Sequence, residues 1–232
     1  LPAVKVRRAK VVPNFQFVRD MKEKLAAAGL TECVSYSFTN MKDVADAKLE
    51  GLCSLVPLRN PLTEDHTHMR ASLVPGMLKI VAMNMRRGNK NLSLFELGKV
   101  FLTGDEPSEK LSLVIALTGE LWTTPARSVQ DIRLAQYFQV KGVVEDFLSR
   151  ISDAKPVFGD ASMPLFHPAR SASITLGGVK IGELGEVHPQ VCRAFDIRGG
   201  ISFAEIDIEA LREVAGRQII YKKISRFPAM SR

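Results

Sequence analysis

Apolar residues recur at helical spacing in three segments of the chain, at residues 14–28, 72–88 and 134–150. An apolar position every three or four residues is typical of a helix with one buried face. Asn14 and Ser72 stand at the start of the first two segments, where their side-chain oxygens can cap free backbone N–H groups. We therefore predict three amphipathic helices.

The predicted strands are of two kinds. Residues 92–102 and 111–118 are nearly continuous in apolar side chains, which is typical of strands covered on both faces. Residues 33–38 instead alternate between apolar and polar side chains, which suits a half-buried strand. Further elements are predicted at 53–58, at 171–187 (two strands turned by Gly177 and Gly178), at 201–208, and as a short helix at 209–215.

The order of these elements indicates an α+β fold. The strands follow one another as hairpins and do not alternate regularly with helices, as a parallel sheet would require. We predict an antiparallel sheet flanked by helices.

Composition narrows the class of protein. The chain has 232 residues, of which 46% are hydrophobic and 25% charged, as in ordinary globular proteins. No apolar run is long enough to cross a membrane, and no signal peptide is recognisable. The three cysteines form no metal-binding pair, so we interpret them as small buried residues in a reducing compartment.

The net charge of +7 is concentrated at the two ends of the chain. Residues 1–30 hold seven Lys or Arg against two acids, and residues 217–232 hold five and no acid. Such ends can contact RNA phosphates without sequence preference, or they can be solvated linkers. We predict a basic flank at 1–13, a main domain at 14–220 and a linker at 221–232.

Glu96 is a carboxylate inside the apolar strand predicted at 92–102. A buried carboxylate needs a partner or a shifted pKa. We expect a structural ion pair with Arg70. The alternative is that Glu96 is a remnant of a ligand-binding site.

Other candidate chemistry is weak. Asp65, His66 and His68 are close in sequence, but zinc takes three or four ligands, and His167 and His188 are distant. We therefore predict a polar loop and no metal site there. The sequence also has no P-loop and no local signature of a nucleophile turn.

Three stretches of the chain resemble one protein family. They are Asn60-Pro61-Leu62-Thr63 leading to Met69-Arg70-Ala71-Ser72-Leu73, then Leu94 to Phe101, then Phe166 to Ala172 with Gly182 to Pro189 behind it. In this order and spacing they resemble the central domain of the β subunit of phenylalanyl-tRNA synthetase, over roughly residues 10–230. The resemblance implies the fold of a class II synthetase core in a domain that is not itself catalytic.

Two positions carry the expected loss of catalysis. The family's catalytic α subunit has Gly-x-Val-Phe/Tyr followed by arginine, whereas here Phe101 is followed by Leu102. A second class II arginine falls at Ala210 or Leu211. Arginine binds phosphate oxygens with a rigid fork, which leucine and alanine lack. We therefore expect no catalytic residue and no cofactor in this domain, although the whole enzyme of this family uses ATP and Mg²⁺.

The resemblance also implies partners. The family forms a cytoplasmic α₂β₂ enzyme that joins phenylalanine to its tRNA, and residues 221–232 resemble its linker to a C-terminal anticodon-binding domain. Since the chain begins with Leu1, we expect it to be a piece of such a protein, able to self-associate when isolated. The residues predicted to face the α subunit are Asn60, Pro61, Arg70, Phe95, Glu96, Gly98 and Phe101, and those predicted to contact tRNA are Lys5, Arg7, Arg8, Lys222 and Lys223.

Two other functions stay open. One is a degraded core that still binds nucleotide, with Lys99 or Arg70 in place of the lost arginines. The other is a tRNA-binding module that acts through its basic ends. ATP binding by the chain would favour the first, and a steep salt dependence of tRNA affinity would favour the second.

Overall fold

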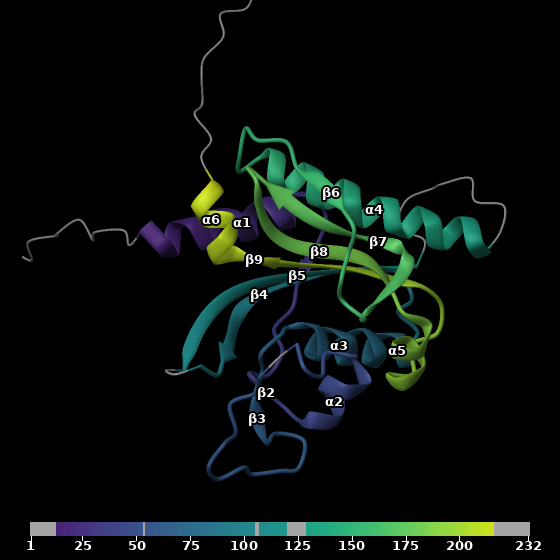
Figure 1. Cartoon of the computed structure of the whole chain (residues 1–232). Coiled ribbons are helices and arrows are strands. Elements are labelled where there is room, and N and C mark those ends of the chain that lie inside the picture. Colours follow the sequence, from purple (N-terminus) through teal and green to yellow (C-terminus); the bar gives the residue numbers. More distant parts are fainter. Residues whose placement is uncertain (1–12, 53, 105–106, 120–128, 216–232) are drawn as a thin grey trace, which may run out of the picture.

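A seven-stranded sheet runs through the centre of the molecule, with helices on both faces (Figure 1). The structure is a computed structural model and describes residues 13–52, 54–104, 107–119 and 129–215. The strand order is β1-β4-β5-β9-β8-β7-β6, antiparallel throughout except for β1, which pairs in parallel with β4. The strands are β1 Thr31–Glu32, β4 Leu92–Leu102, β5 Ser108–Thr118, β6 Val157–Gly159, β7 Phe166–Leu176, β8 Val179–Val187 and β9 Ile201–Asp207. The predicted α+β class is confirmed.

The upper face of the sheet, as seen in Figure 1, is covered by three helices. They are α1 Pro13–Ala27, α4 Val129–Ser149 and α6 Ile208–Val214. Met21, Phe147 and Leu211 bring these helices into one apolar cluster with alternate residues of the strands, such as Leu113 and Ile206. This cluster is the larger of two hydrophobic cores.

The lower face is covered by the helices α2 Met41–Asp46, α3 Val74–Arg86 and α5 Pro189–Ala194 (Figure 1). Leu78 of α3 and Val191 of α5 pack with the other set of strand residues, such as Val114 and Phe203. A small two-stranded sheet, β2 Phe38–Thr39 with β3 His68–Met69, lies below α3.

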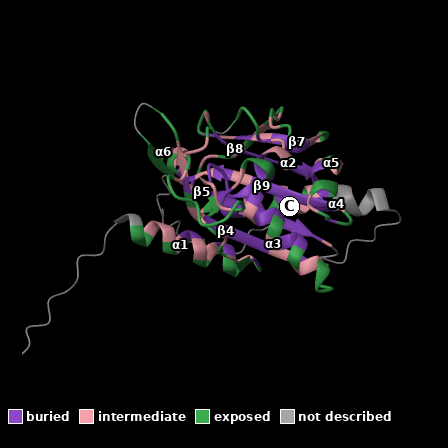
Figure 2. Cartoon of the chain, turned by 90° about the horizontal axis from the view of Figure 1, so that it is seen from below, coloured by how far each residue is buried: buried purple, intermediate pink, exposed green. Residues whose placement is uncertain are grey.

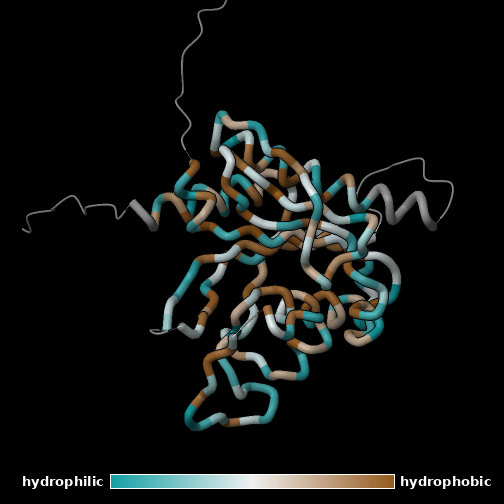
Figure 3. The backbone as a smooth tube through the Cα atoms, viewed as in Figure 1, coloured by the Kyte–Doolittle hydropathy of each residue, from teal (hydrophilic) through white to brown (hydrophobic). Residues whose placement is uncertain are grey.

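The central strands are buried on both sides (Figure 2). Along β4, Phe95 and Leu97 belong to the upper core, whereas Leu94 and Val100 belong to the lower core. The nearly continuous apolar sequence of β4 and β5 follows from this double coverage, as predicted. Figure 3 shows the same pattern as apolar colour along the central strands and hydrophilic colour on the outer loops.

The turn between β7 and β8 lies at Gly177 and Gly178, as predicted. Gly177 and Gly178 have φ of 57° and 86°, which glycine adopts without the steric cost that other residues meet. The predicted helices also exist, with shifted ends. α1 begins at Pro13, so Asn14 lies inside it, and α3 begins at Val74.

The strand predicted at 33–38 is wrong. Only β1 and β2 form at its two ends, and the residues between them join no ladder. The alternation is real, but its faces are inverted: Val34 and Tyr36 are 81% and 75% exposed, while the Ser35 hydroxyl points inward to the carboxylate of Glu96. The orientation of this segment therefore follows the hydrogen bonds of Ser35 with Glu96 and Arg70, and not the burial of Val34 and Tyr36.

The strand predicted at 53–58 is also wrong for the residues described there. Pro57 makes an isolated bridge to His68, and Cys53 lies outside the described residues. Two short helices, α2 and α5, were missed because each has only six residues. The predicted flank at 1–13, apart from Pro13, and the linker at 221–232 lie outside the described residues.

Candidate functional site

A pocket of about 380 Å³ opens on the lower face of the sheet, beside β4, β5, β8 and β9. Leu102, the first position where the catalytic subunit's pattern has arginine, lies in its wall. The second position does not lie there: Leu211 is fully buried in the upper core and Ala210 packs beside it. Of the two positions expected to have lost an arginine, only Leu102 therefore lies at this pocket.

Glu205 of β9 is a half-buried carboxylate of the pocket with a raised pKa. Burial raises its pKa, and the hydrogen bonds that it accepts from the Ser72 hydroxyl, at 2.7 Å, and from the backbone N–H of Leu73 offset only part of this effect. The Ser72 oxygen also accepts the N–H of Val74, 3.1 Å away, at the start of α3. The N-cap of α3 is Leu73 and not Ser72 as predicted, but Ser72 contacts the first turn and ties α3 to the sheet.

Glu183 of β8 is the most buried carboxylate in the pocket wall, only 2% exposed. Burial alone would raise its pKa, but hydrogen bonds from Lys180, Met163 and Ser162 bring it below the ordinary value. Lys180 Nζ lies 2.6 Å from Glu183 Oε1, and the N–H of Met163 lies 2.9 Å from Oε2. This carboxylate has its hydrogen-bonding capacity filled from within the chain.

The charge in this pocket is unsuited to a nucleotide. Three carboxylates, from Glu183, Glu205 and Asp207, face two lysines, and the described residues that line it include no arginine. Both lysines lie next to carboxylates, Lys180 at Glu183 and Lys110 3.7 Å from Asp207. A displacement reaction at the phosphates of ATP needs cations that are not already paired with carboxylates. The described residues that line this pocket offer no such cation.

The predicted pair of Arg70 and Glu96 is confirmed as a second polar centre of the lower face. Arg70 Nη1 lies 2.7 Å from Glu96 Oε1, with both side chains nearly inaccessible to solvent. Arg70 also donates to the backbone oxygen of Lys99, at 2.8 Å, and to the hydroxyl of Ser35, at 2.9 Å. A Cβ at Gly98 would lie 2.5 Å from the guanidinium, so glycine here leaves room for the pair.

The two cations proposed as replacements for the lost arginines are both occupied. Arg70 is held by Glu96, and Lys99 pairs with Glu109 at the exposed end of the β4–β5 hairpin. Lys99 does not line the pocket, and neither does Arg70. The geometry therefore does not favour a substitution of either residue for the missing phosphate contacts.

The residues predicted to face an α subunit lie in different surroundings. Asn60 and Pro61 are exposed in the loop before β3, and Phe101 is half-buried at the end of β4. The side chains of Arg70, Phe95 and Glu96 are buried inside this chain, so they are not exposed on its surface, and Gly98 is half-buried beside Arg70. The contacts with an α subunit stay a prediction, and the predicted tRNA contacts lie outside the described residues.

The histidines of the 65–68 loop make aromatic and hydroxyl contacts. The His66 ring lies 5.4 Å from that of Tyr36 and 6.0 Å from that of Phe38, and His68 Nδ1 lies 2.9 Å from the Thr67 hydroxyl. Within the described residues, no three His, Cys, Asp or Glu side chains gather in a way that could hold a metal ion. No helix in the described part of the chain is long and apolar enough to span a membrane.

Sequence reasoning missed the carboxylates of the pocket. Glu205 lies in the apolar run of β9 and Glu183 in that of β8, which is the same signal that identified Glu96 in β4. Their partners come from Ser72, Ser162 and Lys180, which the sequence alone does not bring together. A search for every acid inside an apolar strand would have found all three carboxylates.

Comparison with known proteins gives a consistent result. Residues 1–208 match the family described as the phenylalanyl tRNA synthetase beta chain CLM domain. The chain is 34% identical over 223 residues to the phenylalanine–tRNA ligase beta subunit of Symbiobacterium thermophilum, covering 91% of this chain and 24% of the relative. It is 32% identical to that of Moorella thermoacetica, covering 100% of this chain and 29% of the relative. The chain thus spans about a quarter of the length of these relatives.

The fold is similar to that of a solved synthetase. The pyrrolysyl tRNA synthetase PylSc of Desulfitobacterium hafniense superposes with a TM-score of 0.62 over 87% of this chain and 73% of its own, at 16% sequence identity. At this identity the likeness concerns the fold alone. The expected synthetase-core architecture is thereby confirmed.

Proposed function

The chain belongs to the phenylalanyl-tRNA synthetase β chain family, and from this premise we propose that it is a core-like domain without catalytic activity. In this proposal it packs against the catalytic α subunit and supports the ATP-dependent charging of tRNA with phenylalanine in the cytoplasm. The observation that carries the proposal is the lining of the 380 Å³ pocket, where Leu102 and three carboxylates replace a phosphate-binding surface.

The energetics of the pocket support the absence of catalysis. Loss of one positioned donor at a developing charge typically costs about 3 kcal/mol of barrier, roughly a hundredfold in rate. If ATP entered this pocket, its phosphates would meet the negative charge of Glu183. They would also meet Glu205, a carboxyl group whose pKa is raised by burial. The lost cation and the acidic lining act in the same direction.

A ridge of exposed apolar side chains supports docking on a partner. Val34 and Tyr36 are 81% and 75% exposed, and Phe38 is 40% exposed with His66 beside it. Contiguous exposed apolar groups of this kind mark interaction surfaces. The buried Arg70–Glu96 pair fixes this segment from behind through Ser35, so the ridge is presented as a rigid surface.

Light scattering on a sizing column tests the docking part of the proposal. The chain is run alone and with the α subunit, and a mixed complex is the expected result. A Val34→Asp/Tyr36→Asp variant should lose the complex, whereas Val157→Asp, at a similarly exposed apolar residue on the far edge strand β6, should keep it. If both variants bind the α subunit as the parent does, the ridge is not the contact.

Calorimetric titration with ATP and Mg²⁺ tests the catalytic part. We expect no heat of binding to the chain at millimolar nucleotide. Saturable binding that is lost when Lys110 is changed to Ala would overturn the proposal in favour of a degraded core that still holds nucleotide.

A further inference from the structure

A second hollow, of about 540 Å³, lies at the opposite end of α3 from the pocket described above. It is formed by the C-terminal end of α3 and by the loop that follows α5. Its walls carry three cations, Arg86, Lys90 and Arg198, against one acid, Asp196. We call this hollow the basic groove.

The cations of the basic groove make no ion pair with any carboxylate in the described part of the chain. Some surface cations elsewhere are matched, such as Lys42 with Asp46 and Arg150 with Asp146, and others, such as Lys155 and Arg212, are not matched within the described residues. The groove is therefore distinguished by the convergence of its three cations on one hollow. A concave wall with unmatched positive charge attracts anions more strongly than a flat surface does, because it focuses the field.

Two further arginines extend this charge. Arg87 follows the last residue of α3, and Arg193 lines an adjoining hollow that shares Gly199 with the groove. Both side chains belong to exposed residues. Positive charge therefore continues from the groove towards α5 through Arg193, in the adjoining hollow.

The loop that carries Arg198 is fixed on its core side. The buried Ile197 donates its N–H to the carbonyl of Cys192, at 2.8 Å, while Asp196 and Gly199 adopt positive φ of 55° and 96°. Arg198 thus projects from a defined turn between two constrained residues. The backbone at this position is therefore defined, so binding an anion needs to order only the exposed side chain.

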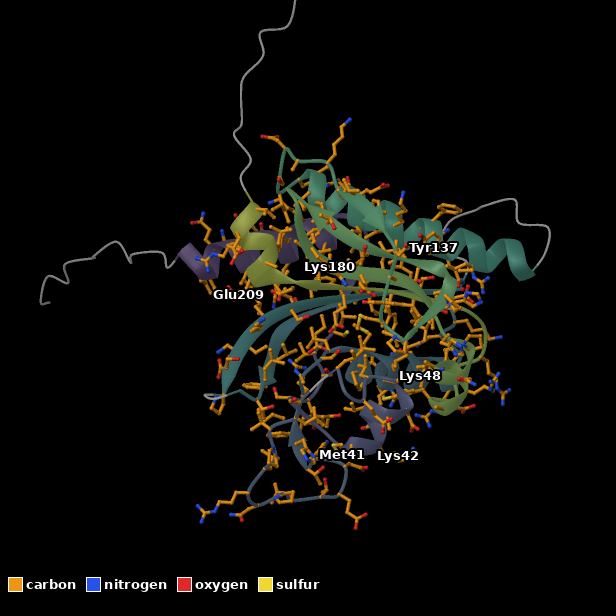
Figure 4. The ribbon with its side chains drawn as sticks, viewed as in Figure 1. Met41, Lys42, Lys48, Tyr137, Lys180 and Glu209 are labelled. Atoms are coloured by element: carbon orange, nitrogen blue, oxygen red, sulfur yellow. The ribbon has the colours of Figure 1, made fainter. Side chains whose placement is uncertain are left out.

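His188, which precedes α5, lies close to other cations, none of which lines the groove. Burial lowers the pKa of His188, and the charges of Lys48, His167 and Arg193 lower it further. Lys48 Nζ lies 3.4 Å from His188 Nδ1. In Figure 4 the labelled Lys48 lies at the same end of the molecule as α5, where several nitrogen-tipped side chains project outward.

The negative end of a helix explains only part of this arrangement. Arg86 lies in the last turn of α3, where a cation interacts favourably with the helix dipole. Lys90 lies beyond the helix, and Arg198 comes from a different segment, so the dipole does not account for their convergence. Their shared feature is the groove.

We propose that the basic groove binds the phosphate backbone of RNA, with Arg86, Lys90 and Arg198 as its contacts. This inference rests on the proposed function, in which the partner is a tRNA. Contacts to phosphates position an RNA without reading its sequence, so the groove would orient the tRNA rather than select it. It is a site on the folded domain and is separate from the basic ends of the chain.

Fluorescence anisotropy with labelled tRNA, at several salt concentrations, tests this inference. The Arg86→Glu/Arg198→Glu variant should bind at least about tenfold more weakly, and the salt slope should fall by about one per lost phosphate contact. The matched control is Lys155→Glu/Arg212→Glu, which makes the same charge change at exposed residues outside the groove and should bind nearly as the parent does. Circular dichroism confirms that each variant is folded, and Arg198→Gln is a milder second variant.

The outcomes separate the groove from its rivals. Equal losses in both double variants, or no loss in either, would overturn the inference, because RNA would then respond to net charge or to the ends of the chain. Displacement of tRNA by millimolar inorganic phosphate at constant ionic strength would also overturn it in favour of a small-anion site. Complex formation with the α subunit is measured separately, so a groove variant that assembles but keeps full tRNA affinity refutes this inference and leaves the proposed function intact.

Discussion

The two faces of the central sheet are built from the same strands but hold different chemistry. The upper core, under α1, α4 and α6, is a cluster of side chains such as Phe147, Ile174 and Leu113. The lower face also has an apolar core, but it contains Glu96 and Glu183 as buried carboxylates. One strand therefore contributes packing on one side and a polar site on the other.

The lower face is the one that combines buried carboxylates with a pocket. Buried carboxylates reduce stability unless each is matched, and on the lower face each is matched by a different device. Glu96 has an arginine, Glu183 has a lysine and backbone N–H groups, and Glu205 has Ser72 and a raised pKa. The upper face of the described strands also holds one such carboxylate, Glu186, which is 2% exposed, faces Ser202 of β9 and pairs with Arg170, whereas the lower face holds three.

The largest effect is expected from removing the cation of the lower face. Arg70→Met leaves the buried Glu96 without its cation and with only the Ser35 hydroxyl as a donor, which should lower the free energy of unfolding by about 3–5 kcal/mol. Urea denaturation followed by circular dichroism measures it. The control is Leu113→Met on the upper face, which keeps volume and should cost less than about 1.5 kcal/mol. Equal costs would remove the distinction between the two faces.

A smaller effect is expected from neutralising the carboxylate of the same pair. Glu96→Gln keeps the shape of the side chain but weakens the hydrogen bonds from Arg70 and Ser35, at a cost of about 1–3 kcal/mol. The same denaturation experiment measures it. A Glu96→Gln variant as stable as the parent would contradict the interpretation that the Glu96–Arg70 pair stabilises the fold.

The pH dependence of stability should distinguish Glu205 from Glu183. The pKa of Glu205 is raised from 4.5 in the folded state, so its contribution is present below pH 4.5 and is lost as pH rises through the folded pKa. The pKa of Glu183 is lowered, so its contribution is present above pH 4.5 and is lost as pH falls. Glu205→Gln should therefore gain stability relative to the parent as pH rises above 4.5. Urea titrations of the parent and of this variant at several pH values measure the difference.

The smallest effect concerns reactivity and not stability. Burial, with the charges of Glu96 and Glu32, raises the pKa of Cys33 to about 12. In a Cys53→Ser/Cys192→Ser variant, alkylation of Cys33 by iodoacetamide at pH 8 should be far slower than in the same chain unfolded in urea, because the thiolate is the reactive form. Equal rates would show that the lower face is open to solvent at this residue.

The predictable part of this fold was the part set by local pattern. β4, the glycine hairpin and the long helices follow from periodicity, turn chemistry and length, and the Glu96–Arg70 pair follows from the cost of a buried charge. The prediction for residues 33–38 was wrong because contacts with Glu96 and Arg70, which are distant in sequence, determine which side chains of this segment point inward. The pocket and the basic groove need residues from distant segments to converge, and no local signal gives that.

The place of β9 in the sheet also decides when the sheet can be completed. β9 is the last of the described strands, yet it lies between β5 and β8, where Thr118 pairs with Ile201 and Leu184 with Ala204. On a ribosome the β4–β5 and β7–β8 hairpins are synthesised first, and each then has an open, apolar edge. Pairing across such separations in sequence is slow, so the nascent chain should depend on chaperones until residue 207 has emerged.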